Sequence, residues 1–241
     1  MRRRVFRLTA ALWVALFVLG ACWGGEECPR GASCAAPFGA GQLVSPSSER
    51  WKRIADSPEP ARQEIAAAVV EGRVWIVGGM DANGRATGAV HVWNEGANNW
   101  TPDVPLPVRV HHAMAAELNG KLFVIGGFFD GGEASDRTFI LEGGAWKDGP
   151  TLRRPRAAGA AVSLRGRIVL VGGVSGREHV EPVEISDGSG WRDGAPIPSP
   201  RDHVGAATDG SFVYVAGGRR SGEHFATFDR YDLEKDRWVS L

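Results

Sequence analysis

Arginine recurs along the chain at intervals close to 47 residues. The four members of this series are Arg62, Arg109, Arg156 and Arg201. His111 and His203 follow two residues after their arginines, at a place where the other two stretches hold Glu64 and Ala158. Guanidinium groups gathered on one rim can hold a carboxylate or a phosphate through paired hydrogen bonds. The series therefore predicts a candidate ligand-binding rim made of Arg62, Arg109, His111, Arg156, Arg201 and His203.

An arginine repeated at one place in every unit also fits a structural role, in which it binds carbonyl or carboxylate groups of its neighbours. Repeats replicate structural roles, whereas ligand sites usually break the symmetry, so we favour the structural interpretation. His111 and His203 do break the symmetry. The rim is therefore where we expect a ligand site if the chain has one.

Other chemistry finds little support in the sequence. It contains no Cys/His metal spacing, no HExxH, no Gly-x-Ser-x-Gly, no GxGxxG before a helix, and no phosphate-binding glycine loop with a lysine. We predict no metal site, no cofactor and no catalytic residues. Lys+Arg and Asp+Glu both number 28, so the formal net charge is zero and no basic field favours nucleic acid.

The elements that would position the rim follow from two series that recur in phase. Diglycines occupy positions 78–79, 126–127, 172–173 and 217–218, and tryptophans occupy positions 51, 100, 146, 191 and 238. Both series have a spacing of 45 to 49 residues, which indicates internal repeats.

Each unit has the pattern of four strands. A strand of small residues is followed by a turn that favours positive φ at both positions, namely Glu71-Gly72, Asn119-Gly120, Arg165-Gly166 or Asp209-Gly210. A second, apolar strand then enters the diglycine, as expected of a strand buried on both faces. The third strand carries Trp93, Phe139 or Tyr231 seven residues before the tryptophan, although the third unit has Glu184 there. The fourth strand begins at the tryptophan.

This pattern resembles the Kelch repeat over about residues 51–241. The resemblance implies an all-β fold, a Kelch-type β-propeller with four complete four-stranded blades at about 61–104, 107–149, 153–194 and 199–241. One extra outer strand is expected at about 50–56, without partner strands of its own, so we predict an incomplete ring. We expect a truncated product or a fragment first, then a native four-bladed ring with a displaced strand, then a ring completed by another chain.

The N-terminal stretch has the features of an export signal. Arginines precede an apolar run over residues 8–19, and the following Leu19-Gly-Ala-Cys22 resembles the lipobox of bacterial lipoproteins. We predict a signal peptide at 1–21, a lipid on Cys22, a Gly/Ala/Ser/Pro-rich tether at 22–48 and the propeller at 49–241. Sec and twin-arginine export both stay open, and Cys28 and Cys34 could be either bonded or free in the oxidising compartment that export implies.

Together these features predict a non-catalytic, lipid-anchored binding module of the bacterial cell envelope, facing the periplasm or the cell exterior. Its predicted partners are the membrane, through the lipid on Cys22, and an unknown protein or carbohydrate ligand. The alternative is an exported carbohydrate enzyme similar to the Kelch-fold sialic acid mutarotases, whose anionic substrate would suit an arginine rim.

Overall fold

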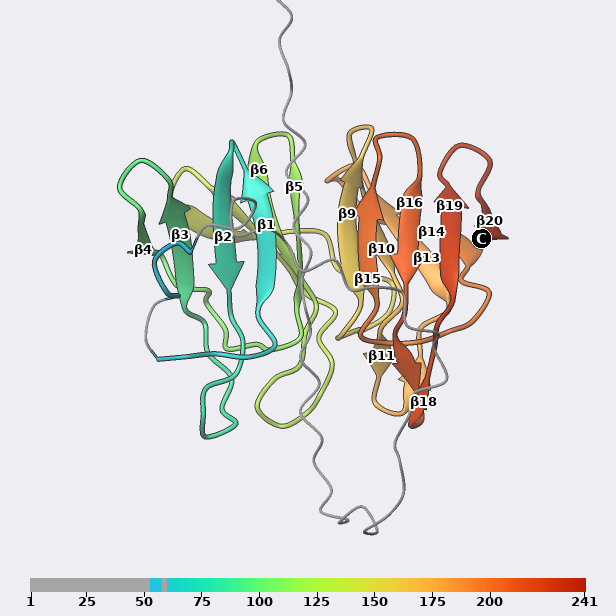
Figure 1. The fold of residues 1–241 in the computed structure, drawn as a ribbon, viewed down its shortest axis with the longest axis horizontal. Helices are drawn as coiled ribbons and strands as arrows, with labels where there is room; N and C mark the ends of the chain where they lie inside the picture. The colour runs from blue at the N-terminus through green and yellow to red at the C-terminus, as the bar shows by residue number, and fades with distance from the viewer. Residues whose placement is uncertain (1–52, 58–59) are drawn as a thin grey trace, which may run out of the picture. The chain divides into compact units, whose positions relative to one another are not determined.

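The described part of the chain is built from strands. The computed structural model describes residues 53–57 and 60–241, and its regular structure there consists of four four-stranded antiparallel sheets and two short hairpins (Figure 1). Within these residues we find no helix with the length and apolar character needed to cross a membrane. The predicted signal peptide, Cys22, Cys28, Cys34 and the tether all lie outside the described residues.

Each sheet is one blade, formed by consecutive strands. Blade one contains β1 (Ala66–Val70), β2 (Arg73–Val77), β3 (Val90–Asn94) and β4 (Asn99–Asp103). Blade two contains β5 (Met114–Leu118), β6 (Lys121–Ile125), β7 (Thr138–Glu142) and β8 (Ala145–Asp148). Blade three contains β9 (Ala160–Leu164), β10 (Arg167–Val171), β13 (Pro182–Ser186) and β14 (Trp191–Pro196). Blade four contains β15 (Gly205–Thr208), β16 (Val213–Ala216), β19 (Phe228–Asp232) and β20 (Arg237–Ser240). The predicted all-β propeller arrangement with four complete blades is thus confirmed.

Two extra hairpins lie in the loops after the second strands of blades three and four. They are β11 (Val174–Ser175) with β12 (Glu178–His179), and β17 (Arg219–Arg220) with β18 (Glu223–His224). The corresponding loops of blades one and two form turns and single β-bridges but no further hairpin.

Three of the four predicted two-residue turns form as expected, with positive φ at both positions: Glu71-Gly72, Asn119-Gly120 and Arg165-Gly166. The prediction for blade four is wrong in length, because Thr208 pairs with Val213 and the loop spans 209–212. The Asp209 carboxylate accepts hydrogen bonds from the amides of Ser211 and Phe212, at 2.7 and 2.9 Å, and so closes a longer turn.

Three apolar clusters join consecutive blades. One joins blades one and two, one joins two and three, and one joins three and four. Backbone hydrogen bonds accompany them, from Gly79 N to Val110 O, Gly127 N to Arg156 O and Gly173 N to Arg201 O. Among the described residues no comparable cluster or diglycine bond joins blade four to blade one. These clusters and diglycine bonds thus join three pairs of consecutive blades in the described part of the chain.

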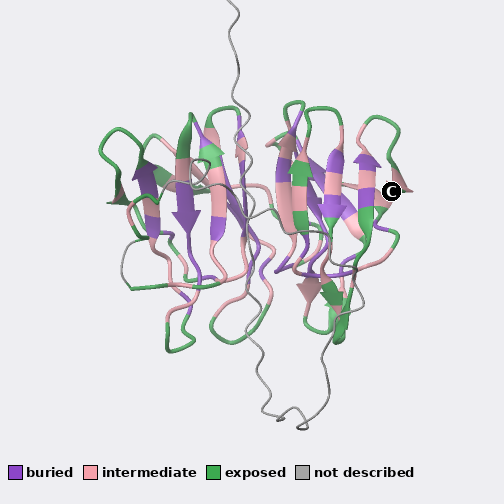
Figure 2. Ribbon diagram, viewed as in Figure 1, coloured by how far each residue is buried: buried purple, intermediate pink, exposed green. Residues whose placement is uncertain are grey.

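The face of blade four that does not pack on blade three is partly exposed. In β10 of blade three the four residues after Arg167 are all buried, whereas in the equivalent β16 only Val213 and Val215 are buried (Figure 2). Phe228 on β19 and Val69 on β1 are both 44% exposed. The burial pattern thus shows one partly exposed face on blade four, whereas on blade one Val69 is exposed but Ile76 on the same face is buried.

A repeated indole contact shows where residues 53–57 lie relative to blade one. The outer-strand indoles of blades two to four donate to Val104 O, Pro150 O and Ala195 O, four positions after the preceding tryptophan. Trp100 Nε1 donates in the same way to Ala55 O, at 3.4 Å. Residues 53–57 are not in a strand, and the rest of the predicted strand at 50–56 lies outside the described residues.

Candidate binding face

Three arginines of the predicted rim point into their own blades. Arg62 Nη1 donates to Gly78 O at 2.8 Å, Arg156 Nη1 to Gly172 O at 3.0 Å, and Arg201 Nε to Gly217 O at 2.6 Å. In each blade the arginine stands 16 residues before the first glycine of the diglycine and binds that glycine's carbonyl. These contacts are the ones that the structural interpretation predicts.

An acceptor on the third strand completes the contacts of each inward-pointing arginine. Arg156 Nη2 lies 2.8 Å from Glu184 Oε1, and Arg201 Nη2 lies 2.8 Å from Asp229 Oδ2. Burial lowers the pKa of Arg156, and the negative charge of Glu184 counters that shift. Both guanidinium groups are fully buried. The two arginines are thus out of reach of a ligand at the surface, and their contacts are those expected of a structural role.

Arg62 is only half-buried, and its partner on the third strand is a histidine, where blades three and four have a carboxylate. Arg62 Nη2 lies 2.9 Å from His91 Nδ1. Burial lowers the pKa of both side chains, and the positive charge of Arg62 lowers that of His91 further.

Strand register explains why Glu184 interrupts the aromatic series. The residues that pair with the blade tryptophans are Trp93, Leu141, Ser186 and Tyr231. The last hairpins of blades two and three are two residues shorter, so a count of seven residues reaches Phe139 and Glu184 instead. By strand register, the equivalents of Glu184 are His91, Phe139 and Asp229. At three of these four positions the side chain contacts the arginine of its own blade.

Blade two replaces the arginine by an apolar residue. Val110 stands 16 residues before Gly126 and is fully buried in one cluster with Phe139. Arg109 lies one position earlier and is exposed. The arginine series in the sequence thus contains three structurally equivalent residues, and a fourth, Arg109, that differs from them in position and surroundings.

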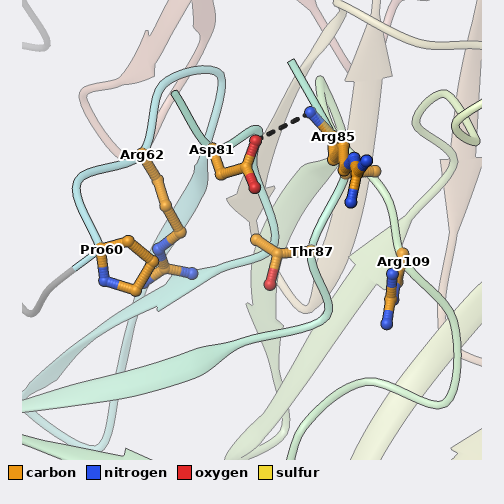
Figure 3. Close-up of a pocket in the computed structure, with 7 residues that line it drawn as sticks. Pro60, Arg62, Asp81, Arg85, Thr87 and Arg109 are labelled. Atoms are coloured by element: carbon orange, nitrogen blue, oxygen red, sulfur yellow. Dashed lines mark hydrogen bonds between the residues drawn. The ribbon is translucent and has the colours of Figure 1, made fainter. Parts of the chain in front are cut away.

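Arg109 instead lines a surface cavity of about 250 Å³. The other residues that line it are Pro60, Arg62, Asp81, Arg85, Ala86 and Thr87 (Figure 3). The side chains of Arg85 and Arg109 make no hydrogen bond or ion pair with any described residue, and both arginines are exposed. Asp81 Oδ1 accepts the amides of Asn83 and Arg85 at 2.9 Å, and these bonds hold the pKa of its carboxyl below the usual value.

Near the centre, one residue from each blade has positive φ without being glycine. These residues are Glu64, His112, Ala158 and His203, with φ between 52° and 55°. Their backbones form a ladder from blade to blade: His112 N donates to Glu64 O, Ala158 N to His112 O, and His203 N to Ala158 O, at 3.0, 2.8 and 2.7 Å. His112, and not His111, is thus the equivalent of His203, and the sequence count missed it because it began from Arg109.

The histidines of this centre are packed against one another. His111 Nδ1 and His112 Nδ1 lie 2.5 Å apart, and both rings contact Phe128. Burial is the main cause that lowers the pKa of His112 to about 3, and the nearby His203, His111 and Arg219 lower it further. Burial also lowers the pKa of His111. Both rings are therefore neutral at pH 7.

The loops that follow the diglycines lie at the same end of the blades as these central residues. Single β-bridges tie the two together, pairing Gln63 with Met80, His111 with Phe128, Ala157 with Val174 and Asp202 with Arg219. The short hairpins β11–β12 and β17–β18 extend from this end (Figure 1). The cavity at Arg85 and Arg109, the central residues and the loops of unequal structure together form what we call the loop face.

Comparison with known proteins agrees with the repeat pattern. A family model described as the Kelch motif matches residues 200–241. The chain is 30% identical over 130 residues to Kelch repeat protein M-T8 of Myxoma virus (strain Lausanne), a match that covers 53% of this chain and 25% of the viral protein. It is 29% identical over 136 residues to alpha-scruin of Limulus polyphemus, covering 53% of this chain and 15% of that protein.

A third relative is Kelch-like protein 35 of Homo sapiens, 36% identical over 95 residues, with 39% of this chain and 16% of the human protein covered. The chain thus spans a quarter or less of the length of these relatives. The matches support the Kelch type of the propeller.

Proposed function

We propose that the chain is a non-catalytic protein-binding module that holds an acidic segment of its partner on the loop face. The observation that carries this proposal is the pair of exposed guanidinium groups of Arg85 and Arg109 at the 250 Å³ cavity, which make no hydrogen bond or ion pair with the described residues. A guanidinium group binds a carboxylate through two parallel hydrogen bonds, and two such groups that line one cavity favour a segment with more than one acidic residue.

The structure of the loop face supports the binding of a polypeptide. The cavity opens beside loops that differ in length and structure from blade to blade, mounted on rigid sheets, which is a common arrangement for recognition. The Thr87 hydroxyl also lines the cavity and supplies a neutral hydrogen-bonding group next to the arginines. The Kelch-repeat relatives are consistent with a binding module of this type.

An anionic sugar is the second ligand that the same arginines would suit. This ligand belongs to the alternative of an exported carbohydrate enzyme. The cavity contributes one carboxylate, that of Asp81, and this group is engaged with two backbone amides and has a lowered pKa. A general acid needs a proton near neutral pH, so Asp81 is unsuited to that role and binding without catalysis is favoured.

We further propose that the module is lipid-anchored at Cys22 in the bacterial cell envelope, facing the periplasm or the cell exterior. The support is the order of basic residues, apolar run and lipobox-like Leu19-Gly-Ala-Cys22 in the sequence. Replacement Cys22→Ser is expected to move the protein from the membrane fraction to the soluble fraction. Retention of the Cys22→Ser protein in membranes would refute lipidation at this residue.

The binding proposal is tested by fluorescence anisotropy of the full chain with a labelled Glu-rich peptide and a matched peptide in which each Glu is Gln. We expect binding of the acidic peptide, weakening with salt, and little binding of the neutral one. The double variant Arg85→Gln, Arg109→Gln is expected to lose about tenfold or more in affinity, since each bond to a charged group contributes roughly 1.5–3 kcal/mol.

The matched control is Arg73→Gln, which removes an exposed arginine beside the Glu71-Gly72 turn at the other end of blade one. Its affinity should equal that of the unaltered chain. If Arg73→Gln lost as much affinity for the Glu-rich peptide as the double variant, overall charge alone would explain the binding. Equal binding of the Glu-rich and the Gln-containing peptide would refute the proposal. Anomerisation of sialic acid by the chain, abolished in the double variant, would favour the enzyme alternative.

A further inference from the structure

Three potential metal ligands from three different blades meet at the centre of the loop face. They are Glu64 from blade one, His112 from blade two and His203 from blade four. One ligand atom of each lies within 4.8 Å of those of the other two. Their side chains are 33%, 13% and 18% exposed, so the group is sheltered but reachable from solvent.

The backbone holds these residues in place before any ligand binds. Each has positive φ, which is unfavourable for a residue with a side chain and persists where the surrounding structure enforces it. The enforcing contacts here are the blade-to-blade hydrogen bonds that link Glu64 to His112 and, through Ala158, His112 to His203. Strain of this kind is common at binding sites, where it orients side chains.

The ring of His203 is oriented as in a metal ligand. Its Nδ1 is hydrogen-bonded to the Asp202 carboxylate, which also lies 2.7 Å from His179 Nε2. Its Nε2 accepts a hydrogen bond of 2.9 Å from Arg219 Nη2, because a guanidinium group can only donate. Nε2 therefore carries a lone pair, and a carboxylate holds the opposite ring nitrogen, which is the arrangement that histidine ligands of metals commonly have.

His112 is held in a similar way. Its Nδ1 lies 2.5 Å from His111 Nδ1, so one ring donates its N–H to the other. Its Nε2 lies 3.2 Å from Glu64 Oε2. In the tautomer that donates from Nδ1 to His111, the lone pair of Nε2 is directed toward the side of Glu64.

We propose that Glu64, His112 and His203 bind a divalent transition-metal ion of the zinc class. Two imidazole nitrogens and one carboxylate oxygen are a suitable donor set for such an ion, and three protein ligands leave a position for water or a partner's side chain. With ligand bonds of about 2.0–2.2 Å, tetrahedral donors lie about 3.3–3.6 Å apart. The present separations, all within 4.8 Å, would therefore have to close by about 1.5 Å at most. Arg219 must also swing away from His203, and its 52% exposure leaves room for that movement.

Local sequence patterns do not reveal such a site, because its ligands are separated by 48 and 91 residues. The site becomes apparent when structurally equivalent positions of the four blades are compared. Ala158 occupies the fourth equivalent place and carries no donor atom.

The test uses the full chain, freed of metal with a chelator and titrated with Zn²⁺ by calorimetry. We expect Zn²⁺ binding that falls at least tenfold in affinity in His112→Ala and in His203→Ala. The matched control is His224→Ala, an exposed histidine on β18, which should bind as the unaltered chain does. Circular dichroism on each variant shows whether the fold is kept.

Two further variants keep the proposal falsifiable if the ligand replacements unfold the chain. Arg219→Gln removes the group that competes for His203 Nε2, and Ala158→His adds a donor at the fourth place; both are expected to raise Zn²⁺ affinity severalfold. The proposal is overturned if the unaltered chain binds no Zn²⁺, or if affinity is the same in all five variants, since the ion would then be held elsewhere, for example by the cysteines.

Discussion

At the scale of single residues, the arginine position of each blade shows how one place in a repeat can be filled in two ways. Blades three and four place a buried guanidinium group against a buried carboxylate, whereas blade two fills the same space with Val110 and Phe139. A buried ion pair adds little net stability over an apolar pair, but a single buried charge without its partner is costly. The two solutions are therefore exchangeable as pairs and not one residue at a time.

This exchange gives a stability prediction. Arg156→Ala leaves Glu184 buried without its cation and is expected to lower the free energy of unfolding by about 3–5 kcal/mol. The double variant Arg156→Val, Glu184→Phe installs the residue pair of blade two and should be more stable than Arg156→Ala. Urea denaturation followed by circular dichroism measures both. A double variant no more stable than Arg156→Ala would contradict the account.

At the scale of elements, the diglycine has a role that depends on the next blade. Gly172 has φ +65°, and a Cβ there would lie 2.7 Å from Arg201 O of blade four. Gly217 has nearly the same φ, +61°, but the nearest atom to a Cβ is Phe225 O of its own loop, at 3.8 Å. The backbone conformation requires glycine at both sites, while the packing of a following blade requires it only at Gly172.

The matched pair Gly172→Ala and Gly217→Ala separates these two effects. Gly217→Ala is expected to cost about 1 kcal/mol for the left-handed backbone alone. Gly172→Ala should cost a further 1–3 kcal/mol or so, because the added methyl group presses on the neighbouring blade. Thermal and urea unfolding of both variants test this difference, and equal losses would mean that the blade interface does not constrain Gly172.

Much of this element level could be predicted from the sequence. The diglycine and tryptophan series placed all four blades because strand packing repeats with the blade. The turn at 209–212 was predicted too short because Asp209 builds a side-chain-closed loop in place of a two-residue turn. The site was predicted less well, since counting from Arg109 instead of from Gly126 shifted blade two by one residue and concealed His112. The burial of Arg156 and Arg201 could not be predicted from the sequence either, because each is buried against a carboxylate 28 residues away.

At the scale of the whole molecule, we expect the exposed apolar side chains on blades four and one to influence association in solution. Phe228 stacks on Tyr214 at 5.6 Å on the face of blade four that no other described blade covers. Val69 on β1 of blade one is exposed as well. The faces of blades one to three that do meet a neighbour bury apolar side chains of the same kind. Exposed apolar blade faces favour association.

We therefore expect the chain to associate as its concentration rises, and Phe228→Lys to reduce that association with little loss of stability. Analytical ultracentrifugation over a concentration series measures the effect. Val104→Lys is the matched control, because Val104 is 42% exposed but precedes the linker to blade two, away from the free face of blade four. Equal behaviour of the two variants would contradict a role for the free face.

The central claim is that the loop face is the surface that binds a partner. Hydrogen exchange measured by mass spectrometry, with and without the Glu-rich peptide, tests this claim most directly. We predict slower exchange in the loop at 80–87 and in the segment at 105–110, which surround Arg85 and Arg109, and no change at the 71–72, 119–120 and 165–166 turns. Protection confined to those turns, at the opposite end of the blades, would contradict the account.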